Sequence, residues 1–155
     1  MGKVLNTFTN TYAGAISRSV DDVVISLANV GEEAIAFGAP VFLDADKKGA
    51  KAFAAGDGMD TFLGFATRIG VKTPDTYGGN EAAYNPGEIM SIIVRGSVVV
   101  PVEDGDVKIG ASVYLSEDGK ITAESSGTEL TNCRFRGNAG PNGNAEVVLT
   151  SRNIQ

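Results

Sequence analysis

Histidine and cysteine, two residue types that often carry catalysis, are scarce in this chain of 155 residues. It has no histidine, so it lacks the commonest general base, the Ser-His and Cys-His nucleophile pairs and the commonest metal ligand. Cys133 is the single cysteine and lies in the strand-like run LTNCRFRG, which predicts a small buried hydrophobic residue. A reactive thiolate of lowered pKa is the alternative for this residue. One cysteine cannot form an internal disulfide.

Carboxylates can act without histidine, either as metal ligands or as a glycosidase pair. The stretch DADKKG at 44–49 begins like a calcium loop, but Lys48 and Ala55 stand where oxygen ligands are required. The acidic pairs at 21–22 and 32–33 are adjacent in sequence, so in strands their side chains would point to opposite faces. There is no tryptophan to stack on a sugar. We therefore predict no catalytic residue, no metal site and no cofactor, and we expect that the protein is not an enzyme.

Composition and charge narrow the class of protein further. The chain is 43% hydrophobic and 21% charged, as in globular proteins, and its 20 glycines follow no three-residue period, which favours a turn-rich β protein. With 13 basic and 19 acidic residues, a net charge of −6 argues against nucleic-acid binding. The apolar run 89–102 is interrupted by Arg95, Gly96 and Pro101, so it predicts one or two strands and no membrane span. The start, MGKVLNTFTN, is too polar for a signal peptide.

The elements that would position any functional residue are predicted to be strands. Two stretches have nearly the same sequence, GAPVFLDAD at 38–46 and GASVYLSED at 110–118. In each, the glycine permits a positive φ, the apolar residues form a short buried strand, and the closing residue, Asp46 or Asp118, is expected to cap a turn. Two copies are too few for a solenoid. They favour an all-β barrel or sandwich with two pseudo-equivalent halves, with chance similarity as the alternative.

The chain divides into an extended N-terminal arm, 1–20, and a β domain, 21–155. The arm contains apolar residues four apart, but it is rich in poor helix formers, so we expect an extended segment, with a disordered terminus as the alternative. Within the β domain, two small subdomains at about 21–72 and 88–150 are a further possibility. They would be joined by the long polar loop 72–88, which is longer than packing requires and is a candidate for contacts.

The order of several motifs resembles that of one known family. NTYAGAISRSVDD is followed by GAPVFL, FLGFATR, TYGGNEAAYNPGE, SIIVRGSVVVPV and GASVYLSEDGKIT. This series is similar to the structural cement, or head decoration, proteins of tailed bacteriophages, and it covers the chain from about residue 10 to the C-terminal AEVVL. Each motif is short and glycine-based, so the resemblance depends on their order.

The resemblance implies an all-β fold, of β-tulip or jelly-roll type, that binds the outer surface of a phage capsid and stabilises contacts between capsomers. It implies the major capsid protein and the protein itself as partners, as a homotrimer or alternatively a dimer, with neither nucleic acid nor membrane. The protein would be made in the host bacterial cytoplasm and found on the virion. A different β-rich virion module, such as a fibre, baseplate or glycan-binding domain, is the alternative.

On this hypothesis, contact residues are expected in the arm and in the long loop. Apolar anchors would hold the arm on the capsid, a basic residue would pair with a capsid carboxylate, and tyrosines, which are enriched at interfaces, would act in the loop. These candidates are Phe8, Tyr12, Ile16, Arg18, Tyr77 and Tyr84.

Overall fold

The computed structural model describes residues 13–68, 83–103, 107–137 and 143–153, and in these ranges it contains strands and no helix. None of the described segments is therefore a helix that could cross a membrane. The prediction of an all-β protein is confirmed. The strands are β1 (Ile16–Ala28), β2 (Ile35–Ala36), β3 (Pro40–Asp44), β4 (Gly49–Lys51), β5 (Phe62–Ala66), β6 (Ala83–Tyr84), β7 (Ile89–Pro101), β8 (Ser112–Leu115), β9 (Ile121–Thr122), β10 (Thr128–Phe135) and β11 (Asn144–Leu149).

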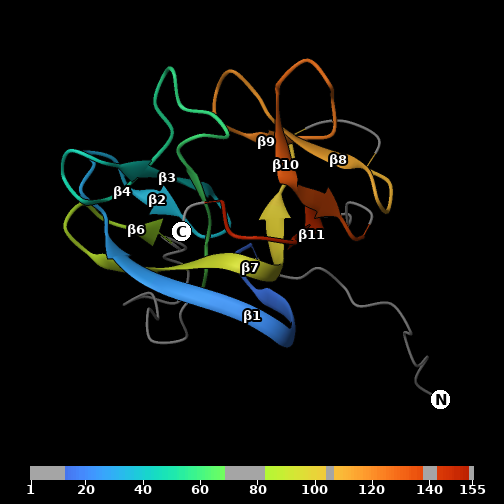
Figure 1. The fold of residues 1–155 in the computed structure, drawn as a ribbon, viewed down its shortest axis with the longest axis horizontal. Coiled ribbons are helices and arrows are strands. Elements are labelled where there is room, and N and C mark those ends of the chain that lie inside the picture. Colours follow the sequence, from blue (N-terminus) through green and yellow to red (C-terminus); the bar gives the residue numbers. More distant parts are fainter. Residues whose placement is uncertain (1–12, 69–82, 104–106, 138–142, 154–155) are drawn as a thin grey trace.

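The long strand β7 organises the molecule. The main sheet has the order β4-β3-β5-β7-β11-β10-β8-β9, and β1 also pairs with β7. All the pairings of β7 are antiparallel: β1 runs along one edge, while β5 and β11 divide the other edge between them. The apolar run 89–101 is therefore one strand that joins two lobes, which we call the first lobe (β2–β6) and the second lobe (β8–β11). In Figure 1 both lobes lie on the same side of β1 and β7.

The strands β3 and β5 are buried on both faces. Phe42, Phe62 and Phe65 point into a core cluster shared with the second lobe, where their rings pack edge to face at centroid distances of 5.3 to 5.9 Å. Their neighbours Val41 and Leu63 belong to a second cluster inside the first lobe. Successive side chains of a strand point to opposite faces, so two-sided burial explains why PVFL and FLGFA are almost continuously apolar.

The two similar stretches, 38–46 and 110–118, have the same local structure. Gly38 and Gly110 both have positive φ, 80° and 85°, and a strand begins two residues after each of them. The strands β3 and β8 each form a hairpin with the next strand, and β5 and β10 then return to pair with them. The prediction of two short strands is confirmed; β3 is mostly buried, whereas in β8 only alternate residues, Val113 and Leu115, are buried.

The predicted turn caps, Asp46 and Asp118, are wrong by two residues. Asp44 Oδ1 accepts the N–H of Lys47 at 3.0 Å, and Ser116 Oγ accepts the N–H of Lys120 at 3.1 Å. The first residue of a turn is the one whose side-chain oxygen faces the N–H three or four residues later, so the acceptor is found there. The sequence pattern located the turns correctly but assigned the cap to the wrong position.

The sheet curls so that its short outer strands approach the ends of the long ones. Parallel bridges join Asn29, just after β1, to Ala50 in β4, and Val102, just after β7, to Ile121 in β9. The same arrangement thus occurs at the end of each lobe, as two equivalent halves would require. The equivalence of the complete halves, and their division into subdomains, stay predictions.

The end of the predicted arm belongs to the sheet. β1 begins at Ile16, and before it Gly14 N–H donates to the Val99 carbonyl at 2.8 Å. Ser17 Oγ donates to the carboxylate of Glu146, a buried residue of β11, at 2.9 Å. Residues 16–20 therefore lie in a strand, while residues 1–12 of the predicted arm lie outside the described residues.

Candidate functional site

The contact residues predicted from the sequence are dispersed. Phe8, Tyr12 and Tyr77 lie outside the described residues. Ile16 stands at the start of β1, opposite Val98, and is 40% exposed. The backbone of Arg18 lies opposite Ser97 in the same strand pair. Among these residues, Ile16 therefore has a side chain that is exposed in the structure and could contact a partner.

Tyr84 is a core residue. It is fully buried, its ring packs edge to face on Phe37 at 5.2 Å, and its hydroxyl donates to the Thr67 carbonyl at 2.7 Å. Burial is also the main reason why the pKa of this phenol is raised above its ordinary value. A buried ring offers no surface to a capsid, so the structure gives Tyr84 a structural role in place of the predicted contact.

The described residues contain no group of three or more Cys, Asp or Glu side chains that could hold a metal ion. Residues 45–48, in the calcium-like stretch, form a turn. Cys133 is fully buried in the core cluster between the lobes, and desolvation raises the pKa of its thiol far above the ordinary value. The thiol is therefore held in its neutral, weakly nucleophilic form, as the prediction of a buried hydrophobic residue requires.

A polar groove lies where β1 bulges away from β7. Residues 19–22 of β1 stand opposite the single residue Gly96, between the pairs Arg18–Ser97 and Val23–Arg95. A Cβ on Gly96 would lie 2.3 Å from Asp22 Oδ1, so glycine is required for the bulge to pack this closely. The groove has a volume of about 410 Å³.

The charges around this groove are partly compensated. The carboxylate of Asp21 forms an exposed ion pair with Arg95, and Arg136 donates to Ser97 Oγ at 3.1 Å. Asp22 Oδ1 is shielded from solvent and has no hydrogen-bond partner. Desolvation therefore raises the pKa of Asp22, and the neighbouring Asp21 raises it further, although a hydrogen bond from the Ser97 backbone opposes both effects.

Large apolar side chains are exposed at the strands β1 and β7 and on the second lobe. Val24 in β1 and Ile89 at the start of β7 are 42% and 71% exposed. Val24 is paired with Ile93, and Ala28 is paired with Ile89, so these residues share one face of the strand pair. Ile109, before β8, is also exposed. Our reading of the sequence missed all three, because an isolated apolar residue in a strand gives no sign of whether its face is covered.

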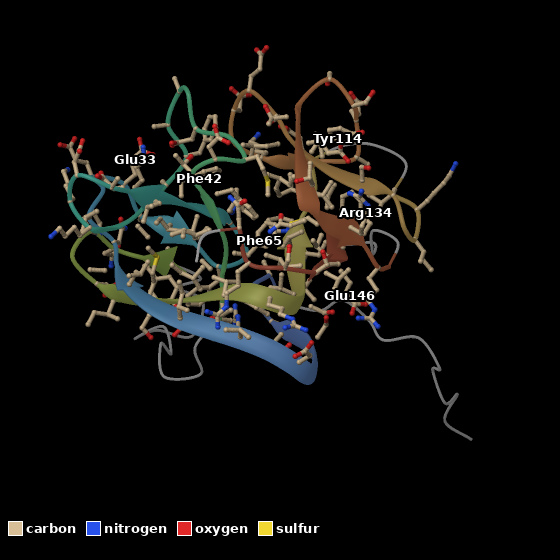
Figure 2. The ribbon with its side chains drawn as sticks, viewed as in Figure 1. Glu33, Phe42, Phe65, Tyr114, Arg134 and Glu146 are labelled. Carbon is tan, nitrogen blue, oxygen red and sulfur yellow. The ribbon has the colours of Figure 1, made fainter. Side chains whose placement is uncertain are left out.

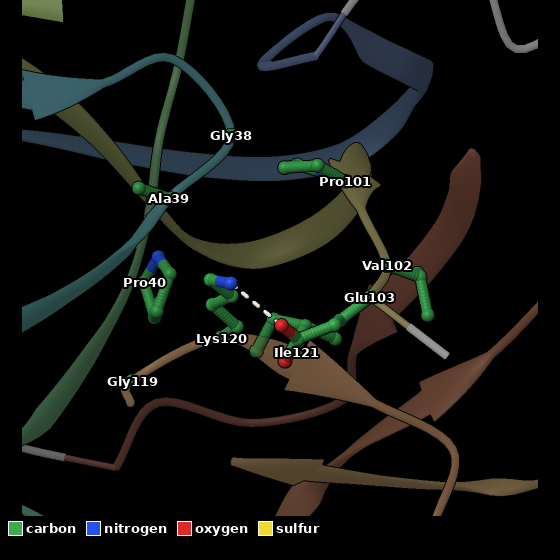
Figure 3. A pocket seen from close by; sticks show the side chains of 9 residues that line it. All are labelled: Gly38, Ala39, Pro40, Pro101, Val102, Glu103, Gly119, Lys120 and Ile121. Atoms are coloured by element: carbon green, nitrogen blue, oxygen red, sulfur yellow. Dashed lines mark hydrogen bonds and ion pairs between the residues drawn. The ribbon is translucent and has the colours of Figure 1, made fainter. Parts of the chain in front are cut away.

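An apolar pocket of about 360 Å³ lies between the lobes. Figure 3 shows Pro40 and Pro101 apart from one another, with Ile121 below and between them and the Lys120–Glu103 ion pair beside Ile121. The stretch 38–46 contributes Gly38, Ala39 and Pro40 to this lining, so it contacts the junction between the lobes and also forms the strand β3. Figure 2 shows Phe42 and Phe65 in the interior, whereas Glu33 extends from the outer end of the first lobe.

The fold defines the structural class of the protein. It is an all-β protein with one core cluster between two lobes and a second inside the first lobe, and its candidate sites are strand surfaces and two grooves.

The chain belongs to the phage structural cement protein family (E217 gp24/Pam3 gp6), whose model matches residues 3–150. It is thus a structural cement protein of a phage capsid, as the order of its motifs predicted. Among solved structures, a chain from the capsid of Myoviridae phage XM1 has a similar fold. The TM-score is 0.73 at 18% sequence identity, and the match covers 96% of this chain and 95% of that chain. A search of the curated proteins found no match.

Proposed function

We propose that this protein decorates the outer surface of the phage head, where it binds the major capsid protein and joins neighbouring capsomers without catalysing a reaction. The observation that carries the proposal is membership of the structural cement family over residues 3–150. The negative charge of the chain is consistent with it, because a protein of net charge −6 has little attraction for the nucleic acid inside a capsid.

The capsid-facing surface is proposed to include the strand pair β1–β7. Ile16, Val24 and Ile89 are large apolar side chains exposed on these two strands, and covering them would add favourable contact area. Phe8, Tyr12 and Arg18 remain proposed contacts of the N-terminal segment, and Tyr77 remains a proposed contact of the long loop. Repetition over a homo-oligomer, a trimer or alternatively a dimer, would strengthen modest individual contacts through avidity.

The direct test is to mix the purified protein with undecorated capsids and image the particles. Regular additional density on the outside, at local symmetry axes, is the expected result. The stoichiometry and shape of that density also distinguish a trimer from a dimer. Bare shells in the presence of folded protein would contradict the proposal.

The N-terminal segment can be tested separately by deleting residues 2–12. This deletion leaves Gly14 and its hydrogen bond to Val99 in place, so the β domain is expected to unfold at an unchanged denaturant concentration. We expect the shortened protein to lose most of its capsid binding. Normal decoration by the shortened protein would remove the N-terminal residues from the proposed contact surface.

A further inference from the structure

In the described ranges, β1 is the one long strand with a neighbour on a single edge. The strands β3, β5, β7, β8, β10 and β11 each lie between two others in the sheet. The terminal strands β4 and β9 have only three and two residues, and the bridges from Asn29 and Val102 meet them on their outer side. β1 has 13 residues and pairs with β7 alone.

The hydrogen bonds at the end of β1 show which of its backbone groups face outward. Asn29 N–H donates towards the β7 side, to the Glu88 carbonyl, whereas Val30 N–H donates to Ala50 in β4. In an antiparallel pair, the N–H and C=O of one residue point to the same side, and this side alternates along the strand. Continuing the alternation backward, Val24 and Ser26 direct their N–H and C=O groups away from β7.

The pairing of β7 leads to the same assignment. Ser91, the partner of Ser26, directs its carbonyl to the N–H of Thr67, which follows β5. This carbonyl is therefore turned away from β1, and Ser26 belongs to a pair that is not hydrogen-bonded. Among the described residues, no strand lies beside the outward backbone groups of Val24 and Ser26.

The outer edge at 23–28 lacks the features that usually prevent strand addition. Its sequence, VVISLA, contains no charge, proline or glycine, and Val24 is 42% exposed. Edge strands of soluble proteins normally carry charges, proline or a bulge that discourages pairing. Here the bulge and the acidic residues Asp21 and Asp22 lie immediately before this segment, and a further register shift falls between Val23 and Val24. β4 reaches the other end at Ala28 and Asn29. The regular part of the edge is therefore 24–27.

We propose that β1 binds an extended segment of the major capsid protein as an additional strand beside residues 24–27, an inference that rests on the proposed function. Main-chain hydrogen bonds to Val24 and Ser26 would supply the part of the affinity that does not depend on the side chains of the incoming strand, as in other cases of strand addition. The matching segment has about four uncharged, β-branched or aromatic residues. A lysine or arginine at the end that meets Asp21 and Asp22 would complement the negative charge of this acidic pair.

A second copy of this chain fits the edge less well. In antiparallel self-pairing, outward-facing residues must stand opposite one another, so Val24 would face Ser26 of the other copy and Asp22 would face its Ala28. Residues 16–21 of each copy, which continue the long strand β1, would then run beside residues 29–34 of the other. β4 already lies at this end of the edge, because the Ala28 carbonyl contacts Gly49 and Asn29 bridges to Ala50. A short capsid segment can end before β4 and avoids this clash.

The test uses proline at the outward-facing N–H of Ser26. Ser26→Pro removes an N–H that the incoming strand needs, while the hydrogen bonds between β1 and β7 remain, since edge strands tolerate proline where the N–H faces solvent. Ser26→Ala is the matched control, because it removes the exposed hydroxyl and keeps the N–H. Binding of both variants and of the unaltered protein to undecorated capsids is measured by co-sedimentation, and their folding is followed by urea unfolding.

We expect Ser26→Ala to bind like the unaltered protein and Ser26→Pro to bind at least about tenfold more weakly, which corresponds to about 1.4 kcal/mol. Equal binding by a folded Ser26→Pro would overturn the proposal while leaving the cement function intact. If the unaltered protein itself does not bind, the proposed function fails and this inference falls with it. If Ser26→Pro instead converts an oligomer of the free protein into monomers, the edge belongs to a second copy and the proposal is wrong.

Hydrogen exchange provides a measurement that does not depend on the proline variant folding. In the unaltered protein, the amides of Val24 and Ser26 are expected to exchange quickly when free and at least about tenfold more slowly on the capsid. The amide of Ile25, which faces β7, is the internal reference and should be protected in both states. Unchanged exchange at Val24 and Ser26 on decorated capsids would contradict strand addition.

Discussion

The substitution Tyr84→Phe separates a structural role of Tyr84 from the contact role that its residue type suggested. It removes one oxygen atom from a fully buried side chain, which deletes the 2.7 Å hydrogen bond to the Thr67 carbonyl and the weaker one that the hydroxyl accepts from the Ser91 N–H at 3.4 Å. The ring and its edge-to-face contact with Phe37 remain. Removing one partner of a buried hydrogen bond costs about 1–3 kcal/mol, so we expect the free energy of unfolding to fall by that amount.

The assay is urea unfolding at neutral pH, in which the midpoint should fall while the m-value stays unchanged. Tyr114→Phe is the matched control, because Tyr114 lies half-buried in β8 and loses the same atom; its effect should be below about 0.5 kcal/mol. Capsid binding by Tyr84→Phe should be normal below its unfolding transition. Equal stability of the two variants would refute the reasoning, and so would a Tyr84→Phe protein that is fully stable but does not bind capsids.

Three further predictions concern the core and the bulge. Gly64→Ala would place a Cβ 2.0 Å from a carbonyl oxygen of β7 and should lower the free energy of unfolding by more than about 2 kcal/mol. In the same unfolding assay, the control Gly58→Ala, whose Cβ would have no contact closer than 3.8 Å, should cost about 0.5 kcal/mol or less. Burial raises the pKa of Cys133, so the thiol should react with Ellman's reagent only after unfolding. Stability should also fall above about pH 8.5, where the unfolded thiol ionises first, and Cys133→Ala should abolish that part of the pH dependence. Because the pKa of Asp22 is raised in the folded state, ionisation of this carboxyl above about pH 4 disfavours folding. Asp22→Asn should therefore increase the free energy of unfolding at pH 7 and have no such effect at pH 3. An unchanged unfolding midpoint at pH 7 would contradict this.

The interface of this protein is expected to depend on backbone groups as well as side chains. A strand edge recognises an extended partner through N–H and C=O groups that every residue carries, and specificity then comes from the few side chains beside it. For β1 these are Val24 and the acidic pair before it. A capsid protein could therefore change much of the contacting segment and keep the interaction, provided that the segment stays extended and retains a basic end.

Several features were predictable from the sequence because they depend on neighbouring residues. Gly38 and Gly110, which begin the two similar stretches, adopt the expected positive φ, and the short apolar runs between turns form the expected strands. Cys133 was correctly predicted to be buried from the strand-like residues around it. The order of glycine-based motifs identified the family. Alternation, turn formation and positive φ are local properties, so a single sequence expresses them directly.

Other features depend on strands that lie far apart in the sequence. Tyr84 was predicted to be a contact residue because tyrosine is common at interfaces, but the strands around it close over its ring. The end of the predicted arm became part of β1, because a partner strand some 80 residues later was there to receive it. The close fit of Asp22 against Gly96 also arises only when these two strands pair.

The sequence by itself determined that this is an all-β protein without histidine, and it determined where the turns fall. The tertiary structure decided which apolar residues are core and which are surface, and that β1 keeps an outward edge in the described part of the chain. The physical reason is that a strand's residues specify its two faces, but burial of a face or an edge requires another segment to cover it. That segment is chosen by long-range pairing, as when β7 receives β1 on one edge and both lobes on the other.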